Sequence, residues 1–432
     1  MSIKQTDLSK KLRQITLEAQ GLIQARAFGS GKAAVLSALE QLGYIQIDTL
    51  SVVTRAHHHT LWTRIPDYQP QWLDQLVTER HIFEYWFHAA SYLPMQDFRF
   101  ALPKMFSIKN GESRYYQADT QVMRNVYDKI RIDGPQKSRA FESLSKNNGS
   151  WWNWKPTKIA LEQLFMQGDL MISARSGMEK VYDIRERVLP NTVNTTPPTA
   201  LEYAEYLVKK YLRAYGFTTM KQMTHLQTGS VLRKNIETIL NQLLEDNIIQ
   251  KLVTPEMQTI YVLTDLFEKT DATHHPKLSL LSPFDNSIIH RERVKTCFDF
   301  DFRLECYTPQ HKRKYGYFCL PILFGDVFIG RVDCKAHRKS GQFELIHLHV
   351  ENRQIDMALW LTPFLNTLHR FMHFNQCQSI HVTQISPSEL SGTIREFIEM
   401  RQMIDQQRLD SVGKMGGDFY SLSTDLHKLS RP

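Results

Sequence analysis

The sequence contains few of the features that mark a disulfide-rich, zinc-binding or membrane protein. It has only 5 cysteines in 432 residues, all of them in the C-terminal half, and no two form a Cys-x-x-Cys pair. Neither a disulfide framework nor a zinc site is therefore expected. No apolar run approaches the roughly 18 residues that a membrane-spanning helix requires, and the first twelve residues carry charges instead of a signal-peptide core. We expect a protein of a reducing cytosol without metal, cofactor or membrane contact.

The composition indicates a folded, basic protein. Hydrophobic residues make up 42% of the chain, which is enough for several cores, and the length favours about three domains. Lysine and arginine number 53 against 45 acidic residues, so the formal charge is +8. Such a balance favours an anionic partner such as nucleic acid.

The order of expected elements repeats three times along the chain. Helical spacing of apolar residues, followed by short extended segments, is the order of a winged helix, in which helices precede a hairpin. Extended segments are expected at 44–48 and 82–87, then at 170–174 and 180–185, and finally at 248–253 and 259–263. We therefore predict three tandem winged-helix modules, over residues 1–118, 119–190 and 198–268.

The sequence changes character after residue 271, where short β-rich runs separated by turn signals predict an antiparallel sheet. The runs are 278–281, 298–307, 317–323, 327–335 and 343–350, and a helix over 357–374 follows. The predicted fold class is thus α+β, with a β-rich C-terminal domain over residues 275–385 and a helical, flexible tail over 386–432.

Gln46 and Asp48 are the strongest chemical signal in the sequence. Residues two apart on a strand project from the same face, so both polar groups can meet one substrate while Ile45 and Ile47 face the core. A carboxylate near a DNA-binding surface opposes the phosphate field unless it takes part in chemistry. The structural alternative is that Asp48 caps a turn and Gln46 is a solvated strand residue.

Two basic clusters are candidates for contact with DNA phosphates or bases. The first follows Asp48 directly and contains Arg55, His57, His59 and Arg64; the alternative for its histidines is a solvated turn. The second is the run Lys312-Arg313-Lys314 between two predicted strands, which is also the composition of an ordinary solvated loop.

The predicted second module offers two more candidates for contact with DNA. Lys158 lies on its helix and Arg175 near the tip of its hairpin. An ordinary charged turn is the alternative for Arg175.

Four segments together resemble the YcaQ-like crosslink-repair DNA glycosylases, a bacterial winged-helix family that includes the AlkZ branch. The resemblance extends from about residue 10 to about residue 385. The segments are Gln46-Ile47-Asp48, Leu281-Ser282-Pro283-Phe284-Asp285-Asn286, Lys314-Tyr315-Gly316-Tyr317 with Leu320-Pro321-Ile322, and Gly330-Arg331-Val332-Asp333 followed by Lys335.

The resemblance implies a function and assigns Gln46 and Asp48 as the catalytic residues. The implied enzyme is a monofunctional DNA glycosylase that hydrolyses N7-alkylated purines from double-stranded DNA and unhooks interstrand crosslinks, with no cofactor and no obligate protein partner. The Asp form of the motif looks like the YcaQ branch, which handles a broader set of alkylated purines. The competing hypothesis is a non-enzymatic winged-helix regulator. A nuclease is disfavoured because no cluster of metal-binding carboxylates surrounds the pair.

Overall fold

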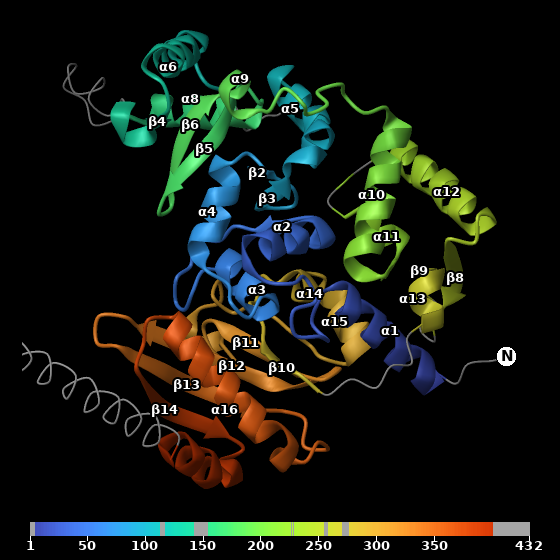
Figure 1. Cartoon of the computed structure of the whole chain (residues 1–432), viewed down its shortest axis with the longest axis vertical. Coiled ribbons are helices and arrows are strands. Elements are labelled where there is room, and N and C mark those ends of the chain that lie inside the picture. Colours follow the sequence, from blue (N-terminus) through green and yellow to red (C-terminus); the bar gives the residue numbers. More distant parts are fainter. Residues whose placement is uncertain are drawn as a thin grey trace, which may run out of the picture.

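A computed structural model (Figure 1) describes residues 5–112, 117–141, 154–225, 227, 229–254, 258–269 and 276–400. These residues form a mixed helix and sheet fold with three small three-stranded sheets and one five-stranded sheet. The part of the predicted tail beyond residue 400 lies outside the described residues. Within the described ranges, no helix has both the length and the apolar character needed to cross a membrane.

The first sheet contains the strand that carries Gln46. Its order is β1 (Ile45–Gln46), β3 (Ala90–Pro94) and β2 (Ile82–Trp86), with antiparallel neighbours. Its helices are α1 (Gln5–Ala19), α2 (Gly31–Leu42), α3 (Ala56–Arg64) and α4 (Pro70–Thr78), and η1 (Met95–Ala101) and α5 (Leu102–Lys109) follow β3.

Gly43 brings the chain directly from α2 into β1. Its φ of 77° lies in the left-handed region, and its N–H donates to the Leu39 carbonyl to close the helix. A side chain at this position would meet Lys210 at 2.7 Å. A glycine at the end of α2 therefore fixes where the strand that carries Gln46 begins.

The second and third sheets repeat the pattern of one short strand and a hairpin. The second has the order β4 (Gln136–Lys137), β6 (Glu179–Ile184) and β5 (Leu170–Ser176), with α6 (Thr120–Asp133), η2 (Ser138–Phe141), α8 (Trp154–Met166) and α9 (Arg185–Val188). The third has the order β7 (Phe217–Thr218), β9 (Thr259–Leu263) and β8 (Ile249–Val253), with α10 (Ala200–Tyr215), α11 (Met220–Met223), α12 (Ser230–Glu245) and α13 (Thr264–Lys269). Thr199 and Glu202 form a capping box that starts α10.

The five-stranded sheet lies at the other end of the molecule from the second sheet (Figure 1). Its order is β10 (Leu278–Leu280), β11 (Cys319–Phe324), β12 (Val327–His337), β13 (Gln342–Val350) and β14 (Ser379–Ser386). The associated helices are α14 (Asn286–Ile289), α15 (Arg291–Phe298), η5 (Gln310–Lys312), α16 (Met357–Phe374) and η6 (Ser388–Leu390). β10 to β13 pair antiparallel as predicted. β14 was not predicted, and it pairs with β13 in parallel because α16 carries the chain back between the two strands.

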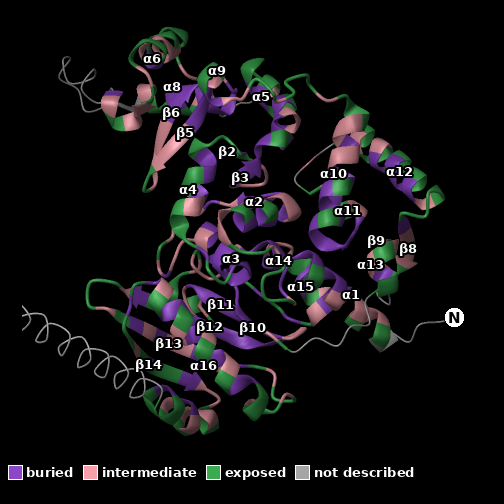
Figure 2. Ribbon diagram, in the orientation of Figure 1, coloured by how far each residue is buried: buried purple, intermediate pink, exposed green. Residues whose placement is uncertain are grey.

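One hydrophobic core joins the first sheet and its helices to the five-stranded sheet. Buried residues of α2, α3 and α4 pack in the same cluster as those of β11, β12, β13 and α16, and Figure 2 shows this buried layer through the middle of the molecule. A backbone hydrogen bond of 2.9 Å from Ala336 to Val52 links the two parts. The first unit is thus held rigidly against the C-terminal sheet.

One expectation about local structure was wrong, and one alternative is excluded. Residues 298–307 do not form a strand, because α15 ends at Phe298 and an irregular loop leads to β11. The basic segment after Asp48 is the helix α3, most of which is buried, and not a solvated turn.

We predict that the ion pair between Arg175 and Glu84 holds the first and second sheets together. Arg175 on β5 donates to both carboxylate oxygens of Glu84 on β2, at 2.7 and 2.8 Å, and the exposed fractions of the two side chains are 7% and 1%. Arg175→Ala would leave the Glu84 carboxylate buried with only Lys180 nearby, at 3.4 Å. The expected loss is about 3 kcal/mol in the free energy of unfolding, measured by chemical denaturation.

The exposed pair Lys129–Asp133 on α6 supplies the control, because its side chains are 28% and 43% exposed. Lys129→Ala should change stability by about 0.5 kcal/mol or less. Equal losses in the two variants would show that the buried pair has no special role.

Candidate active site

Gln46 and Asp48 lie on the same side of the chain where β1 ends. Ile45 and Ile47 are buried at 0% and 8%, whereas Gln46 and Asp48 are half-buried. Gln46 pairs with Ser91 of β3, and the N–H of Ile47 donates to the Ala90 carbonyl at 2.8 Å. The burial alternates as the sequence predicted, although the strand itself covers only the first two of these residues.

The Asp48 carboxylate has one oxygen committed and one available. Oδ1 accepts a hydrogen bond from the Leu50 N–H at 3.1 Å, whereas Oδ2 is buried and has no hydrogen-bond partner among the described residues. Burial raises the pKa of Asp48, although the backbone N–H groups of Leu50 and Thr49 partly offset this effect. Oδ2 is thus a hydrogen-bond acceptor that no described protein group satisfies.

Gln46 is held by a histidine that the sequence analysis did not single out. His88, in the turn between β2 and β3, places Nε2 3.1 Å from Oε1 of Gln46. Its ring meets the Tyr44 ring edge-on, with 4.7 Å between the centroids. His88 lies 42 residues beyond Gln46, and only the pairing of β1 with β3 brings the two together.

The irregular loop between α15 and β11 forms the other side of the site. The Asp48 charge acts on Cys306 and Tyr307, where it adds to burial in raising the pKa of the thiol and of the phenol. Tyr307 is 81% exposed. No pattern in the sequence assigned these two residues to the site, because both lie in the segment 298–307 that was expected to be a strand.

Glu305 gives this loop a fixed shape. Its carboxylate accepts backbone hydrogen bonds from Lys314, Tyr315 and Gly316 at 2.9, 2.8 and 3.1 Å. Burial alone would raise the pKa of Glu305, but these three donors lower it. These hydrogen bonds therefore hold the end of the basic run Lys312-Arg313-Lys314 in a fixed position relative to Glu305.

Several predicted DNA-binding residues are on the surface. Lys158 on α8, Lys312 and Lys314 are exposed, and Arg55 and Arg313 are half-buried. Arg313 donates to the Thr308 carbonyl at 2.8 Å and lies over the Tyr317 ring. Its charge and that of Asp48 both act on the Cys306 thiol, so the basic run belongs to the loop that lies opposite Asp48.

His57, His59 and Arg64 are not placed to contact DNA, which corrects the expectation for them. All three lie on α3 and are 4%, 0% and 0% exposed. His57 lies against Tyr92 of β3, whereas His59 and Arg64 contact Leu280 and Asp285 of the C-terminal part. Burial lowers the pKa of His57, and it lowers that of His59 to about 4. Arg64 forms an ion pair with Asp285 of 2.7 Å inside the protein.

Arg175 likewise does not meet the expectation of a phosphate contact, because its guanidinium is bound to Glu84. Its position near a hairpin tip was inferred correctly, but the tip packs against the first sheet. Arg175 therefore serves as the ion-pair partner of the buried Glu84.

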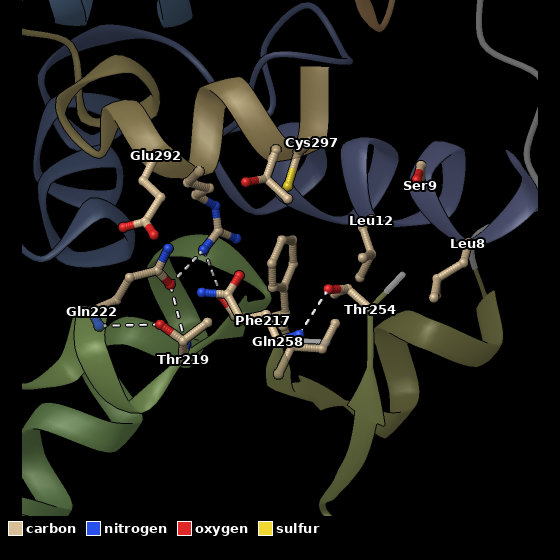
Figure 3. Close-up of a pocket in the computed structure, with 13 residues that line it drawn as sticks. Leu8, Ser9, Leu12, Phe217, Thr219, Gln222, Thr254, Gln258, Glu292 and Cys297 are labelled. Atoms are coloured by element: carbon tan, nitrogen blue, oxygen red, sulfur yellow. Dashed lines mark hydrogen bonds between the residues drawn. The ribbon is translucent and has the colours of Figure 1, made fainter. Parts of the chain in front are cut away.

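A small cavity elsewhere in the molecule does not belong to this site. It lies between α1, α15 and the third sheet, with Thr219, Gln222 and Cys297 in its wall (Figure 3). Its volume of about 30 Å³ holds one or two waters, which is far too little for a nucleobase. In the described part of the chain, no group of three or more histidine, cysteine or acidic side chains is arranged to hold a metal ion.

Comparison with known sequences identifies the family. Residues 39–363, which include the Gln46–Asp48 segment and the loop around Tyr307, match the family described as DNA glycosylase AlkZ-like. The chain belongs to this family. The resemblance inferred from the sequence is confirmed, and the AlkZ-like chain is thereby placed among the DNA glycosylases, whose substrate is DNA.

A solved structure supports the assignment at the level of the fold. The DNA glycosylase AlkZ of Streptomyces sahachiroi is similar with a TM-score of 0.57 and 13% sequence identity, over 86% of this chain and 98% of that one. At this identity the likeness concerns the arrangement of helices and sheets. The roles of individual side chains in the AlkZ-like chain have to be argued from its own geometry.

Proposed function

We propose that this AlkZ-like chain is a monofunctional DNA glycosylase that hydrolyses the N-glycosidic bond of N7-alkylated purines and unhooks interstrand crosslinks. The observation that carries the proposal is the buried, unpartnered Oδ2 of Asp48 beside the Gln46 amide. An unsatisfied buried carboxylate oxygen reduces stability. Such an atom is expected where it acts on a substrate.

The chemistry of the lesion explains why these two side chains suffice. Alkylation at N7 makes the purine a cationic leaving group, so the base needs little help from an acid when the bond to C1′ breaks. The Asp48 carboxylate stabilises the positive charge that develops on the sugar and accepts a proton from the attacking water. The Gln46 amide holds that water in position.

The burial of Lys210 argues against a lyase step, which needs a lysine that can attack the sugar. The charge of Lys210 acts on His88, but the Lys210 side chain is 3% exposed and its Nζ donates to the Tyr206 hydroxyl at 2.6 Å. A Schiff base requires a lysine that reaches C1′ of the sugar. We therefore infer simple hydrolysis that leaves an abasic site.

We infer that the three small sheets and their helices are winged-helix units arranged around the duplex. Lys158 lies on a helix that directly precedes a hairpin, as the recognition helix of such a unit does. Arg55 follows Asp48 closely in the sequence, and the run Lys312-Arg313-Lys314 lies on the loop that contains Cys306 and Tyr307. We infer that these residues hold the backbone next to the lesion. The half-buried Asp48 would then meet the sugar from a groove.

An open site suits a crosslinked substrate. A base joined to both strands is hard to extrude into a closed pocket, and Asp48 faces a loop whose Tyr307 is almost fully exposed. A site bounded by one loop and one strand end can receive a purine that stays in the helix. This supports unhooking as part of the activity.

Base release is the test of the proposed function. The full chain is incubated with duplexes that carry N7-methylguanine or a nitrogen-mustard crosslink, and free base and abasic sites are measured. We expect release from both, with strong losses in Asp48→Asn and Gln46→Ala and unchanged duplex affinity in both variants. Binding without any released base would favour the non-enzymatic winged-helix regulator instead.

We infer that the protein works in the bacterial cytoplasm, and the state of its cysteines supports this. All five are free thiols, and four of them are buried. Reduced thiols at every cysteine fit the reducing bacterial cytoplasm, which also contains the chromosomal DNA.

We predict that Lys312 and Lys314 contact DNA phosphates. Both side chains are exposed at the end of the loop that Glu305 orders. Each change to alanine should weaken duplex binding and lower the slope of log K against log salt by about 1, as measured by fluorescence anisotropy. Lys129→Ala on α6, distant from this loop, is the control. A slope that stays constant in both loop variants would remove these lysines from the interface.

A further inference from the structure

His88 is the side chain that contacts the proposed catalytic amide. It lies in the turn between β2 and β3, and its Nε2 is 3.1 Å from Oε1 of Gln46. An amide oxygen only accepts hydrogen bonds, so Nε2 of His88 must carry the hydrogen. The bond therefore fixes both the tautomer of His88 and the direction in which the Gln46 amide points.

The direction of the amide decides what Gln46 can do. With Oε1 held by His88, the NH₂ group of Gln46 points the other way, and it donates to no other described residue. A water that accepts from this NH₂ group can donate one hydrogen to Oδ2 of Asp48. Its second lone pair then remains free to attack C1′. The reverse orientation would offer the water an acceptor and compete with Asp48 for its hydrogen.

We propose that His88 is a positioning residue, which holds the Gln46 amide with its NH₂ group towards the attacking water beside Asp48. The proposal rests on the proposed glycosylase function and names a further residue of that site. In the step that His88 supports, the water oxygen bonds to C1′ and the bond from C1′ to the purine breaks, with its electron pair leaving on the base. The proton released by the water passes to Asp48.

The surroundings keep His88 neutral, which suits this role. Burial, and then the nearby charges of His225 and Lys210, lower the pKa of His88 to about 4. A neutral imidazole donates one hydrogen bond without placing a positive charge beside the sugar, where positive charge develops. Its ring is packed against Tyr44, and Phe87 lies next to both.

The third sheet contributes to this arrangement although it lies far along the chain from Gln46. His225 follows α11, and its ring centroid is 5.6 Å from that of His290, which in turn packs near Tyr215 and Tyr211 of α10. Lys210 belongs to the same helix and lies over the Phe87 ring at 4.2 Å. The groups that lower the pKa of His88 and pack against its ring therefore come from both the first and the third sheet units.

The test is a double-mutant cycle on single-turnover base release from N7-methylguanine duplex. His88→Phe keeps the ring and removes the donor, and it should slow release about tenfold, which corresponds to about 1.4 kcal/mol for one hydrogen bond. In Gln46→Ala, the same change should have no further effect. His88→Gln, whose amide can donate, should recover most of the rate. The control is His81→Phe, at a side chain that is 53% exposed.

A second measurement does not depend on activity. The ¹⁵N shifts of the His88 ring at pH 7 should show the neutral tautomer with hydrogen on Nε2. Hydrogen on Nδ1 alone would overturn the proposal, as would an unchanged rate in His88→Phe or an equal loss in the Gln46→Ala background. A wild-type protein that releases no base would instead overturn the glycosylase function, and this assignment with it.

Discussion

Asp48→Asn is expected to slow single-turnover base release by about a hundredfold to a thousandfold, a loss of about 3 to 4 kcal/mol in transition-state stabilisation. The asparagine keeps the shape and the hydrogen bond that Oδ1 makes with the Leu50 N–H. It removes the negative charge below the developing sugar cation and the acceptor for the proton of water. Duplex affinity should not fall, because one repulsive charge near the phosphates is lost.

The same variant should be no less stable than the wild type. Burial raises the pKa of Asp48, which means that the folded protein holds the charged form at an unfavourable free energy at neutral pH. Thermal unfolding should therefore show an unchanged or higher Tm in Asp48→Asn. A loss of rate together with equal or greater stability is the signature of a group retained for function.

The pH dependence of the reaction follows from the same shift. Base release needs the ionised carboxylate, so the rate should decline as the pH falls through the pKa of Asp48. That decline should be centred at a pH above about 3.9, the pKa of an unperturbed aspartate. The control is Asp299→Asn, at a side chain that is 92% exposed, which should leave the pH profile unchanged. A full rate in Asp48→Asn would remove the carboxylate from the reaction.

Arg64→Met is expected to lower the free energy of unfolding by about 3–5 kcal/mol. Arg64 and Asp285 are both 0% exposed, and two hydrogen bonds of 2.7 and 2.9 Å join them. Arg64 also donates to the backbone and side chain of Gln20 and to the Thr60 carbonyl. Its loss would strand the Asp285 carboxylate and several acceptors without a donor.

The position of this pair explains why the effect should be large. Arg64 ends α3 of the first unit, whereas Asp285 is the N-cap of α14 and accepts from the Ser287 N–H at 2.9 Å. The pair thus joins the unit that carries Gln46 and Asp48 to the C-terminal part. Lys295→Ala, which breaks an exposed pair with Asp299, should change stability by less than about 1 kcal/mol. Equal losses of stability in Arg64→Met and Lys295→Ala, measured by urea unfolding, would show that the buried Arg64–Asp285 pair does not join the two parts.

Acid should weaken the same junction. Burial alone would raise the pKa of Asp285, but the Arg64 guanidinium and Ser287 lower it. A lowered pKa in the folded state contributes stability above the unfolded value of about 3.9, and this contribution is lost as the pH falls towards the folded value. The wild type should lose stability in this range by more than Arg64→Met does.

The sequence was most informative where the pattern is local. The helix over 357–374 has the predicted bounds in α16, and the hairpins at 170–185 and 248–263 are present. Apolar periodicity determines such elements because the same face is buried whatever it packs against. The strand 298–307 was predicted wrongly because a run of aromatic residues packs equally well in a buried loop, as Phe300 and Phe302 do.

The candidate site was only partly accessible from the sequence. Gln46 and Asp48 were found because two polar groups interrupt an apolar strand, and their catalytic role remains a prediction. His88, Cys306 and Tyr307 carry no comparable signal. They reach the site through strand pairing and loop packing, which a single sequence does not encode at any fixed spacing.

The sequence by itself determined the order of elements, the basic character of the chain and the alternation that turns Gln46 and Asp48 to one side. The tertiary structure decided which basic residues are available to DNA. His59 and Arg64 have the composition of a phosphate-binding segment, yet α3 packs its surface against the C-terminal sheet and buries them. Burial depends on the partner surface, and that surface lies more than half the chain away.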